Sequence, residues 1–279
     1  MKKLKRVAPP KAYNNTEFMN SPDARTIRIL SEFLEPRKRF REEHIYDTIV
    51  FFGSARIQSA AEAETRLKEF VRTFRRRRRP DKTLLAKYQA LKSAAEMSRY
   101  YEDAEKLTWM LSKWAQNFDK KRHFVVCSGG GPGIMEAANR GAHRAGAKSV
   151  GLNISLPFEQ SPNRYITQGL SFEFHYFFMR KFWFIYLAKA LVMFPGGFGT
   201  FDEVFEVLTL LQTKKVIKPL PVVLYGPKYW KTVINFDAMV KMGTISEADL
   251  KLIKFFDTPE DTFAYLKREL TRIYAKEHK

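Results

Sequence analysis

The chain has 279 residues, 45% of them hydrophobic and 28% charged, a balance that is ordinary for a globular protein and excludes wholesale disorder. Its 49 Lys and Arg exceed its 30 Asp and Glu by 19, so we expect anionic partners, from small phosphates to nucleic acid or an acidic membrane surface. Cys127 is the single cysteine, which excludes an internal disulfide and favours a reducing compartment.

Membrane and export signals are weak in this sequence. A basic start is followed by Pro9-Pro10-Lys11, where the apolar stretch of a signal peptide would have to begin. The most apolar run, Phe182 to Phe194, is too short to span a bilayer and contains Lys189. We therefore expect a soluble, cytoplasmic protein without a membrane partner.

The amino-terminal part of the chain is mainly helical in pattern. Residues 1–21 are basic and aperiodic and predict a loose arm, after which Asp23 is placed to cap a helix that runs to about Arg41. The apolar run Thr48 to Phe52 predicts a buried parallel strand that ends at Gly53-Ser54, a turn suited to facing a phosphate. Charged helical patterns follow over 57–80, where Pro80 ends the helix, and over 84–119.

From Phe124 onward, strands and helices alternate. The expected elements are a strand over 124–127, a helix after Gly133, a strand over 149–154, a helix over 177–188, a strand over 190–194, a helix over 200–213, a strand over 220–225 and helices near 227–242 and 259–276. This alternation predicts an α/β protein with a Rossmann-like, doubly wound, mostly parallel sheet and helices on both faces. We expect residues 1–45 to form an N-terminal arm and helix, and residues 46–279 to form one domain with a helical elaboration at about 57–120.

A first glycine-rich turn, Ser128 to Glu136, follows a predicted strand and opens a helix. Glycines let the backbone approach a ligand closely, and a helix N-terminus attracts a phosphate, although tight strand–helix packing also demands glycine. A dinucleotide fingerprint fails because its third glycine would fall on Ile134 and because the strand Ser149 to Ile154 holds no acid for a ribose. The turn is not a Walker loop either, because no Gly-Lys-Ser/Thr sequence follows it. We therefore expect that the protein binds neither NAD nor ATP and uses no cofactor.

A second glycine-rich turn, Pro195 to Glu203, again lies between a strand and a helix. We expect the two turns to lie at the carboxyl ends of neighbouring strands and to face each other across one crevice. Three glycines, a threonine and two carboxylates in nine residues suit a phosphate and a sugar together. Glu203, one turn into the helix, can reach back over that crevice.

The second turn matches the pattern PGGxGTxxE, and Met179-Arg180-Lys181 precedes it. These paired motifs resemble those of the Lonely Guy (LOG) family of cytokinin riboside 5′-monophosphate phosphoribohydrolases, long mislabelled "lysine decarboxylase", and the longer forms are the most similar. The resemblance covers about Ile49 to Leu252. It implies hydrolysis of the N-glycosidic bond of a purine nucleoside 5′-monophosphate, AMP or an N6-modified AMP, without a cofactor. It also implies a homo-oligomer, a dimer or a hexamer built from dimers.

Cleavage of a ribosyl–base bond builds positive charge at the anomeric carbon, so the site needs a fixed carboxylate, donors for the phosphate or base, and a water. Glu203 is our candidate for the carboxylate and Arg180 for the anchor of the nucleotide, and by resemblance these two match the family's catalytic residues. The resemblance adds nucleotide contacts at Lys181, the Gly196, Gly197, Phe198, Gly199 and Thr200 loop, Thr209 and Glu159. The remaining expected substrate contacts are Ser54, Gly130, Gly131, Gly133, Met135 and Asp202.

Other readings of these residues stay open. His175, in an aromatic stretch, is either a general acid or a packed side chain. No His, Cys and carboxylate cluster has metal-ligand spacing, so we expect no metal. A non-catalytic carrier of a nucleotide or phosphorylated cofactor would use the same scaffold. A nucleic-acid-binding protein would use the run Arg75 to Arg79, but aromatic residues do not interleave with that run.

The helix around Arg180 is unusually aromatic. Its rings are Tyr176, Phe177, Phe178, Phe182, Trp183, Phe184 and Tyr186. At 3.6 residues per turn they surround the helix, so a single core-facing stripe cannot bury them all. We expect this helix to lie at a subunit interface, unless helices from 84–119 or the N-terminal arm cover it within one chain.

Overall fold

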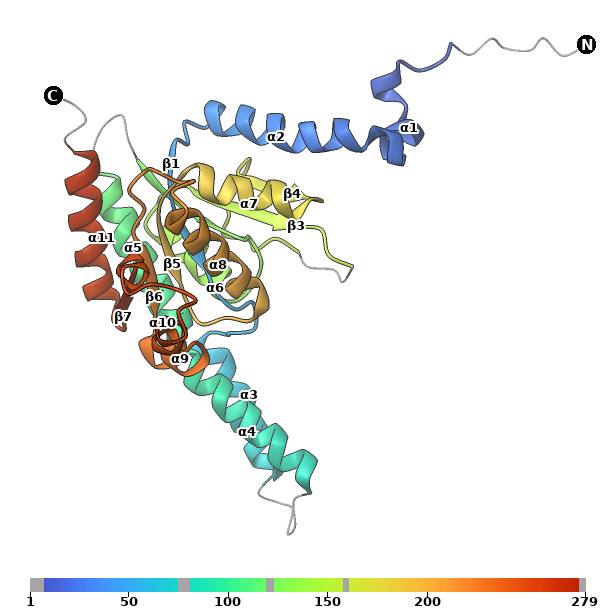
Figure 1. The fold of residues 1–279 in the computed structure, drawn as a ribbon. Helices are drawn as coiled ribbons and strands as arrows, with labels where there is room; N and C mark the ends of the chain where they lie inside the picture. Colours follow the sequence, from blue (N-terminus) through green and yellow to red (C-terminus); the bar gives the residue numbers. More distant parts are fainter. Residues whose placement is uncertain (1–7, 75–80, 119–122, 158–160, 276–279) are drawn as a thin grey trace, which may run out of the picture.

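The computed structural model describes residues 8–74, 81–118, 123–157 and 161–275 (Figure 1). Its centre is a seven-stranded sheet in the order β4-β3-β2-β1-β5-β6-β7, and all six strand pairings are parallel. The strands are β1 (Asp47–Phe52), β2 (Phe124–Ser128), β3 (Ser149–Ile154), β4 (Ser171–Phe174), β5 (Ala188–Met193), β6 (Val222–Tyr225) and β7 (Ile253–Phe256). The order runs outward from β1 in both directions, so the sheet is doubly wound with its switch point between β1 and β5. The predicted fold class is confirmed.

Helices cover both faces of this sheet. They are α1 (Thr16–Asn20), α2 (Arg25–Glu42), α3 (Ala60–Phe74), α4 (Lys82–Met97), α5 (Arg99–Ala115), α6 (Ile134–Arg144), α7 (Phe177–Tyr186), α8 (Phe198–Gln212), α9 (Pro227–Val233), α10 (Phe236–Lys241) and α11 (Pro259–Tyr274). Three short 3-10 turns, η1 (Ala12–Asn14), η2 (Pro22–Ala24) and η3 (Asp249–Leu252), complete the described elements. Among the described residues, no helix is long and apolar enough to cross a bilayer.

Side-chain alternation along the strands builds two separate cores. Val50 and Phe52 of β1 face the layer of α2, α7, α8 and α9, whereas Ile49 and Phe51 face the layer of α5, α6 and α11. Every residue of β1 is buried. A strand that is buried on both faces has a nearly continuous run of apolar residues. The central strands could therefore be predicted from the sequence.

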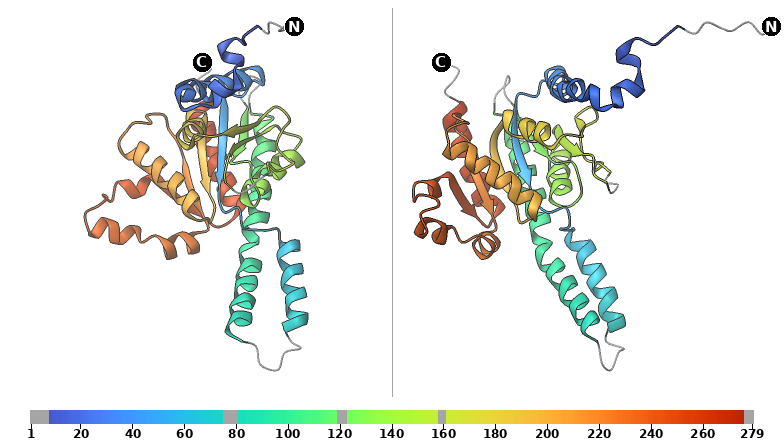
Figure 2. Two further views of the ribbon diagram at one scale, coloured as in Figure 1. Left: turned by 90° about the vertical axis from the view of Figure 1, so that its right-hand side faces the viewer. Right: turned by 45° about the vertical axis from the view of Figure 1, so that its right-hand side comes forward.

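The helices α3 and α4 form a hairpin that projects away from the sheet (Figure 2). Its inner side is held by ring contacts, with Phe74 stacked on Tyr88 at a centroid distance of 5.2 Å and on Phe70 at 5.7 Å. The expected helical elaboration at 57–120 therefore consists of this hairpin and α5, which packs against α6 and α11. The run Arg75 to Arg79 lies outside the described residues.

The helix α2 is bound to the domain through polar as well as apolar contacts. The carboxylate of Glu32 accepts hydrogen bonds from the backbone N–H of His175 (2.8 Å) and Tyr176 (3.2 Å), and its carbonyl accepts one from the indole of Trp183 (3.0 Å). Phe33 adds a ring contact to Trp183 with centroids 5.9 Å apart. The helix α2 thus covers part of the aromatic surface of α7 within the same chain. Cover of this kind by the N-terminal part of the chain was the alternative to a subunit interface.

Several predicted details were wrong. Asp23 does not cap α2, because it lies inside the turn η2 and the N-cap residue Ala24 has no capping side chain. Residues 12–14 and 16–20 of the expected loose arm are helical, and Asn15 caps the second of these segments. The strands β4 and β7 were missed, because each is short and carries a charged residue, Glu173 or Lys254, that interrupts the apolar pattern.

Two expected helices are each divided. The segment 84–119 is divided into α4 and α5 at Ser98, whose hydroxyl donates to the carbonyl of Ala95. The segment 227–242 is broken because Ile234 is extended and Asn235 caps a new helix by accepting from the N–H of Ala238.

Candidate active site

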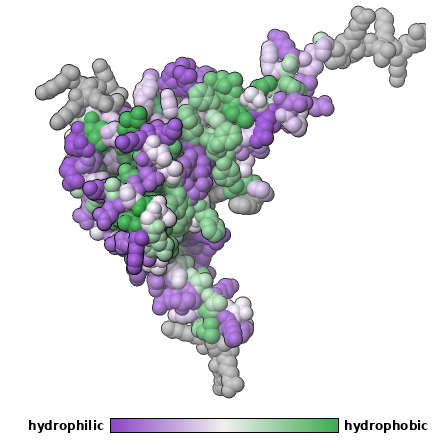
Figure 3. All heavy atoms as spheres, in the orientation of Figure 1, coloured by the Kyte–Doolittle hydropathy of each residue, from purple (hydrophilic) through white to green (hydrophobic). Residues whose placement is uncertain are grey.

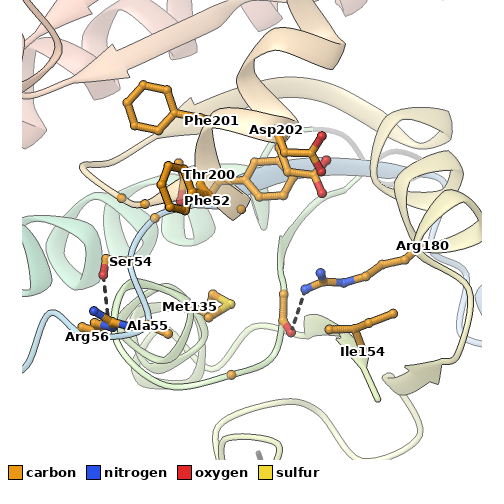
Figure 4. A pocket seen from close by; sticks show the side chains of 18 of the residues that line it. Phe52, Ser54, Ala55, Arg56, Met135, Ile154, Arg180, Thr200, Phe201 and Asp202 are labelled. Atoms are coloured by element: carbon orange, nitrogen blue, oxygen red, sulfur yellow. Dashed lines mark hydrogen bonds between the residues drawn. The ribbon is translucent and has the colours of Figure 1, made fainter. Parts of the chain in front are cut away.

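A cavity of about 880 Å³ opens at the carboxyl ends of the central strands (Figure 4). It is lined by Phe52, Gly53, Ser54, Ala55, Arg56, Gly129, Gly131, Met135, Asn153, Ile154, Leu156, Phe177, Arg180, Gly196, Gly197, Phe198, Gly199, Thr200, Phe201, Asp202, Glu203, Tyr229 and Val233. The volume lies within the range typical of sites for small ligands. The switch point of the sheet, between β1 and β5, is where an open α/β fold places such a site.

The prediction that the two glycine-rich turns follow neighbouring strands is wrong. The first turn follows β2 and the second follows β5, and β1 lies between these two strands. The turn after β1 joins them. The N–H of Ser54 donates to the carbonyl of Pro195 (3.0 Å), and the carbonyl of Ser54 accepts from the N–H of Ile134 (3.1 Å). Ser54 therefore fixes the spacing of the two turns across the cavity.

The glycines of the first turn have different surroundings. Gly129 and Gly131 line the cavity, whereas Gly130 and Gly133 do not. Both of the latter have positive φ, 74° and 71°, and a Cβ on Gly130 would lie 2.2 Å from the Asn153 amide oxygen. Gly130 is thus required by packing and backbone geometry, and the first N–H of α6 is already bonded to Ser54.

The second turn presents the start of α8 to the cavity. Gly197, Phe198, Gly199 and Thr200 all line it, and a Cβ on Gly197 or Gly199 would meet no atom within 4 Å. Phe198 is 96% exposed. A helix N-terminus carries unpaired N–H groups and the positive end of the helix dipole. Of the two turns, this one offers the more accessible cradle for an anion.

Arg180 enters the cavity from α7 with its guanidinium held by backbone carbonyls. Its Nε donates to the carbonyl of Leu152 at 2.7 Å, and its Nη2 lies 3.5 Å from the carbonyl of Gly129, the contact drawn as a dashed line in Figure 4. Its charge also lies over the ring of Phe184, 5.1 Å from the centroid. Burial lowers the pKa of Arg180, an effect that the nearby Glu203 opposes. The residue remains a fixed positive charge, because its ordinary pKa is far above neutrality.

Glu203 is a buried carboxylate on the first turns of α8, 5% exposed. Its Oε2 has no hydrogen-bond partner among the described residues. Burial raises the pKa of Glu203 to about 7, and the charges of Arg180 and Lys181 oppose that rise. A buried carboxylate with an unsatisfied oxygen is unusual in a folded protein, and such perturbed groups gather at functional sites.

Lys181 takes a different direction from its neighbour Arg180. Its ammonium pairs with Asp202 (2.7 Å) and Glu206 (3.1 Å) of α8 and does not line the cavity. Thr209 is likewise outside it, because its exposed hydroxyl donates to the carbonyl of Phe205 (2.7 Å). The expected contact at Glu159 lies outside the described residues. Apart from these three and from Gly130 and Gly133, the expected positions, including Met135 and Asp202, do line the cavity.

Several lining residues were not anticipated. Asn153 is buried within β3, where its amide donates to the carbonyl of Phe172 (2.9 Å); a lone amide in an apolar strand could have drawn attention to it. Arg56 follows Gly53-Ser54-Ala55 and brings a second cation to the cavity. Tyr229 arrives from α9, and no local pattern marked it.

Neither a histidine nor a metal cluster is found at the cavity. The ring of His175 packs edge-on against Tyr176, with centroids 4.7 Å apart, and does not line the cavity. Within the described ranges, no three His, Cys, Asp or Glu side chains are grouped so that they could hold a metal ion. Among the described residues, the charged groups that line the cavity are Arg56, Arg180, Asp202 and Glu203.

Comparison with known proteins gives one family. A family model described as "Possible lysine decarboxylase" matches residues 135–266. A probable cytokinin riboside 5′-monophosphate phosphoribohydrolase of Oryza sativa subsp. japonica is 27% identical over 145 residues, 51% of this chain and 58% of that protein. A cytokinin riboside 5′-monophosphate phosphoribohydrolase of Arabidopsis thaliana is 24% identical over 163 residues, 58% of this chain and 72% of that protein. The chain thus spans less than two thirds of the rice relative.

Solved structures with a similar fold include two named for the molybdenum cofactor. The molybdenum cofactor binding protein of Rippkaea orientalis is 17% identical, with a TM-score of 0.45 over 62% of this chain and 88% of that chain. The Moco carrier protein of Chlamydomonas reinhardtii is 20% identical, with a TM-score of 0.40 over 62% of this chain and 89% of that chain. The family model and the two plant relatives, taken together, show that part of this chain is similar to proteins of the LOG family.

Proposed function

We propose that this protein hydrolyses the N-glycosidic bond of a purine nucleoside 5′-monophosphate, AMP or an N6-modified AMP, and releases the free base and ribose 5-phosphate. One observation carries the proposal. The buried carboxylate of Glu203 lines the cavity with Oε2 unpartnered, and Arg180 lines the same cavity. A ribose hydroxyl of the substrate could donate a hydrogen bond to this oxygen.

The chemistry follows from these charges. As the bond from C1′ to the purine nitrogen breaks, its electron pair leaves with the base and positive charge grows on the sugar. A preorganised carboxylate at Glu203 stabilises that charge and can orient the water whose oxygen forms the new bond to C1′. The water's proton balances the charge on the departing base, directly or through solvent.

The phosphate of such a substrate would bind at the start of α8. The Gly197 to Thr200 segment is open to the cavity, and its amide groups and helix dipole favour an anion there. Arg180 would neutralise further negative charge from α7. The exposed ring of Phe177 and the side chain of Val233 lie at the same cavity and suit the flat, apolar face of a purine.

The plant relatives, named as phosphoribohydrolases of cytokinin riboside 5′-monophosphates, support the reaction class. The test is direct: the purified protein is incubated with a panel of purine nucleoside monophosphates, and free base and ribose 5-phosphate are measured by chromatography. Release of both products in equal amounts is expected for at least one member of the panel. Tight binding of a nucleotide without release of base would contradict the proposal and favour the carrier alternative.

We also propose that the protein assembles as a homo-oligomer through α7. Phe178, Phe182 and Tyr186 follow one another at intervals of four residues, and they are 52%, 37% and 58% exposed. Leu30 and Leu34 of α2 are exposed as well. Figure 3 shows hydrophobic side chains gathered where α2 lies along α7. An apolar stripe that remains exposed after α2 has packed is suited to a second copy of the chain.

A further inference from the structure

A second hollow of about 610 Å³ lies at the opposite edge of the sheet from the candidate active site. It is bounded by the segment Lys214 to Pro221, which precedes β6, by Lys251 and Leu252, which precede β7, and by α11. Because all strands are parallel, the amino ends of β6 and β7 face away from the first cavity. A ligand here would be separate from the proposed substrate.

The hollow carries an excess of positive charge. Among the described residues that line it, Lys214, Lys218, Lys251 and Arg272 stand against the single carboxylate of Glu269. That carboxylate is already engaged by Arg272 (2.8 Å) and Arg268 (3.3 Å). The three lysines have no ion pair within 4 Å among the described residues. Three cations around one hollow thus lack an anionic partner in the part of the chain that the structure describes.

Lys218 is the best-placed of these cations. Its ammonium is half-buried and donates to the carbonyls of Ile185 (2.7 Å) and Tyr186 (2.9 Å) at the end of α7. An ammonium has three N–H groups, so one remains for a ligand. The neighbouring carboxylate of Asp47 pairs instead with Lys189 at 3.2 Å.

The electrostatic state of Lys218 agrees with this geometry. Burial, followed by the charge of Lys189, lowers the pKa of Lys218 to about 8, while Asp47 opposes that fall. A cation that is desolvated without a carboxylate is destabilised, and an anion bound beside it would remove that penalty.

The walls of the hollow are apolar. Ile217 is 89% exposed, an unusual state for a large aliphatic side chain, and it lines the hollow together with Val216, Leu252, Tyr265 and Ile273. Cations beside an apolar wall suit a ligand with an anionic group and an apolar part. Inorganic phosphate would satisfy only the first of these features.

We propose that this hollow is a second ligand site, which binds a small organic phosphate through Lys218, Lys214 and Lys251 and holds its apolar part against Ile217 and Tyr265. The site lies beneath the helix that carries Arg180, since Lys218 binds the last carbonyls of α7. It is independent of the proposed hydrolysis, and its test requires no turnover.

Isothermal titration with phenyl phosphate tests the site. Lys218→Met keeps most of the length of the side chain and removes its charge, and Lys215→Met is the matched control, because Lys215 is exposed and does not line the hollow. We expect Lys218→Met to weaken one binding component at least tenfold and Lys215→Met to leave it unchanged. The candidate active site is intact in all three proteins, so identical titrations would overturn the proposal.

A second variant and a second ligand test the site independently of Lys218→Met. Should Lys218→Met alter the thermal unfolding of the protein, the double variant Lys214→Met/Lys251→Met, at two exposed positions, is expected to weaken the same component. Binding of this double variant equal to that of the wild type would overturn the proposal. Phenyl phosphate is expected to bind more tightly than inorganic phosphate, and equal affinities would refute the role of the apolar wall.

Discussion

The hydroxyl of Tyr229 donates a hydrogen bond of 2.5 Å to the carbonyl of Gly196, which ties α9 to the turn that precedes α8. The next residue, Trp230, is fully buried, and its indole N–H lies within hydrogen-bonding distance of the carbonyls of Met193 (3.2 Å) and Tyr225 (2.9 Å). The helix α9 therefore braces the second glycine-rich turn from behind. Tyr229 and Trp230 thus position the second glycine-rich turn, although they contribute no charge to the cavity.

Tyr229→Phe removes this hydrogen bond and keeps the ring. We expect kcat/KM for a nucleoside monophosphate to fall about 5-fold, because a neutral hydrogen bond contributes about 1 kcal/mol, with most of the change in KM if the turn holds the phosphate. Steady-state kinetics measure the effect. Tyr46→Phe, at an exposed ring away from the cavity, is the control, and equal losses in both variants would rule out the positioning role.

Glu203→Gln and Arg180→Ala test the charged pair. Each should lower kcat by about 10²–10³, the usual loss when one preorganised group at a transition state is removed. Glu206→Gln, one turn further along α8 and outside the cavity, should retain nearly full activity. Circular dichroism establishes that the variants are folded. Near-wild-type turnover in Glu203→Gln would eliminate the proposed mechanism.

We expect the protonation of the Glu203 carboxyl to determine the pH dependence of both activity and stability. Its pKa is raised from 4.5 to about 7, chiefly by burial, so the carboxylate form needed for catalysis appears as the pH rises through 7. We expect kcat/KM to increase up to about pH 7 and then level, since this parameter follows the free enzyme. Activity that is flat from pH 5 to pH 8 would contradict this assignment.

The same shift links folding to pH. A raised pKa means that the folded state holds the proton more tightly than the unfolded chain, so the stabilisation is complete below pH 4.5 and is lost as the pH rises through 7. The shift corresponds to on the order of 3 kcal/mol. Denaturant unfolding of the wild type and Glu203→Gln isolates it: the difference between their free energies of unfolding should change with pH in that window.

The start of α8 should make the reaction selective for phosphate. If the Gly197 to Thr200 segment holds the 5′-phosphate, AMP should be cleaved far faster than adenosine, because the nucleoside forgoes both the helix N-terminus and Arg180. Rates of base release at equal concentrations give the ratio. Equal rates for the two compounds would mean that this segment binds something other than the phosphate.

The exposed rings of α7 should control assembly. Light scattering is expected to give at least twice the monomer mass of 32.6 kDa. The double variant Phe178→Glu/Tyr186→Glu, which places two charges on the stripe, should shift the protein to the monomer. Leu85→Glu, on the projecting helix α4, supplies an exposed apolar control. A wild-type protein that is fully active as a clean monomer would refute the interface.

Sequence patterns predicted the fold well where a segment carries its own signal. The central strands are continuously apolar and the turns after them are rich in glycine, so β1, β2, β3 and β5 were recognisable. The short strands β4 and β7 lack a continuous apolar run, because Glu173 and Lys254 interrupt them. Asp23 was a plausible cap, yet the turn η2 moved the start of the helix past it.

The candidate site was only partly predictable, for a geometric reason. Arg180 and Lys181 are adjacent in sequence, but successive residues of a helix point about 100° apart, so one enters the cavity while the other pairs with Asp202 and Glu206. Tyr229 reaches the cavity from a later strand–helix unit. Such a residue becomes visible only when the order of the strands is known.

The central position of β1 has a consequence for how this protein folds. Ser54 joins turns that lie about 80 and 140 residues further along the chain, and the contacts between them exist only after the strands on both sides of β1 have docked. Contacts so distant in sequence form late, because long loops must close first. The binding of a ligand to the cavity should therefore appear with the final cooperative step of refolding, and fragments that end before α8 should be unable to bind it.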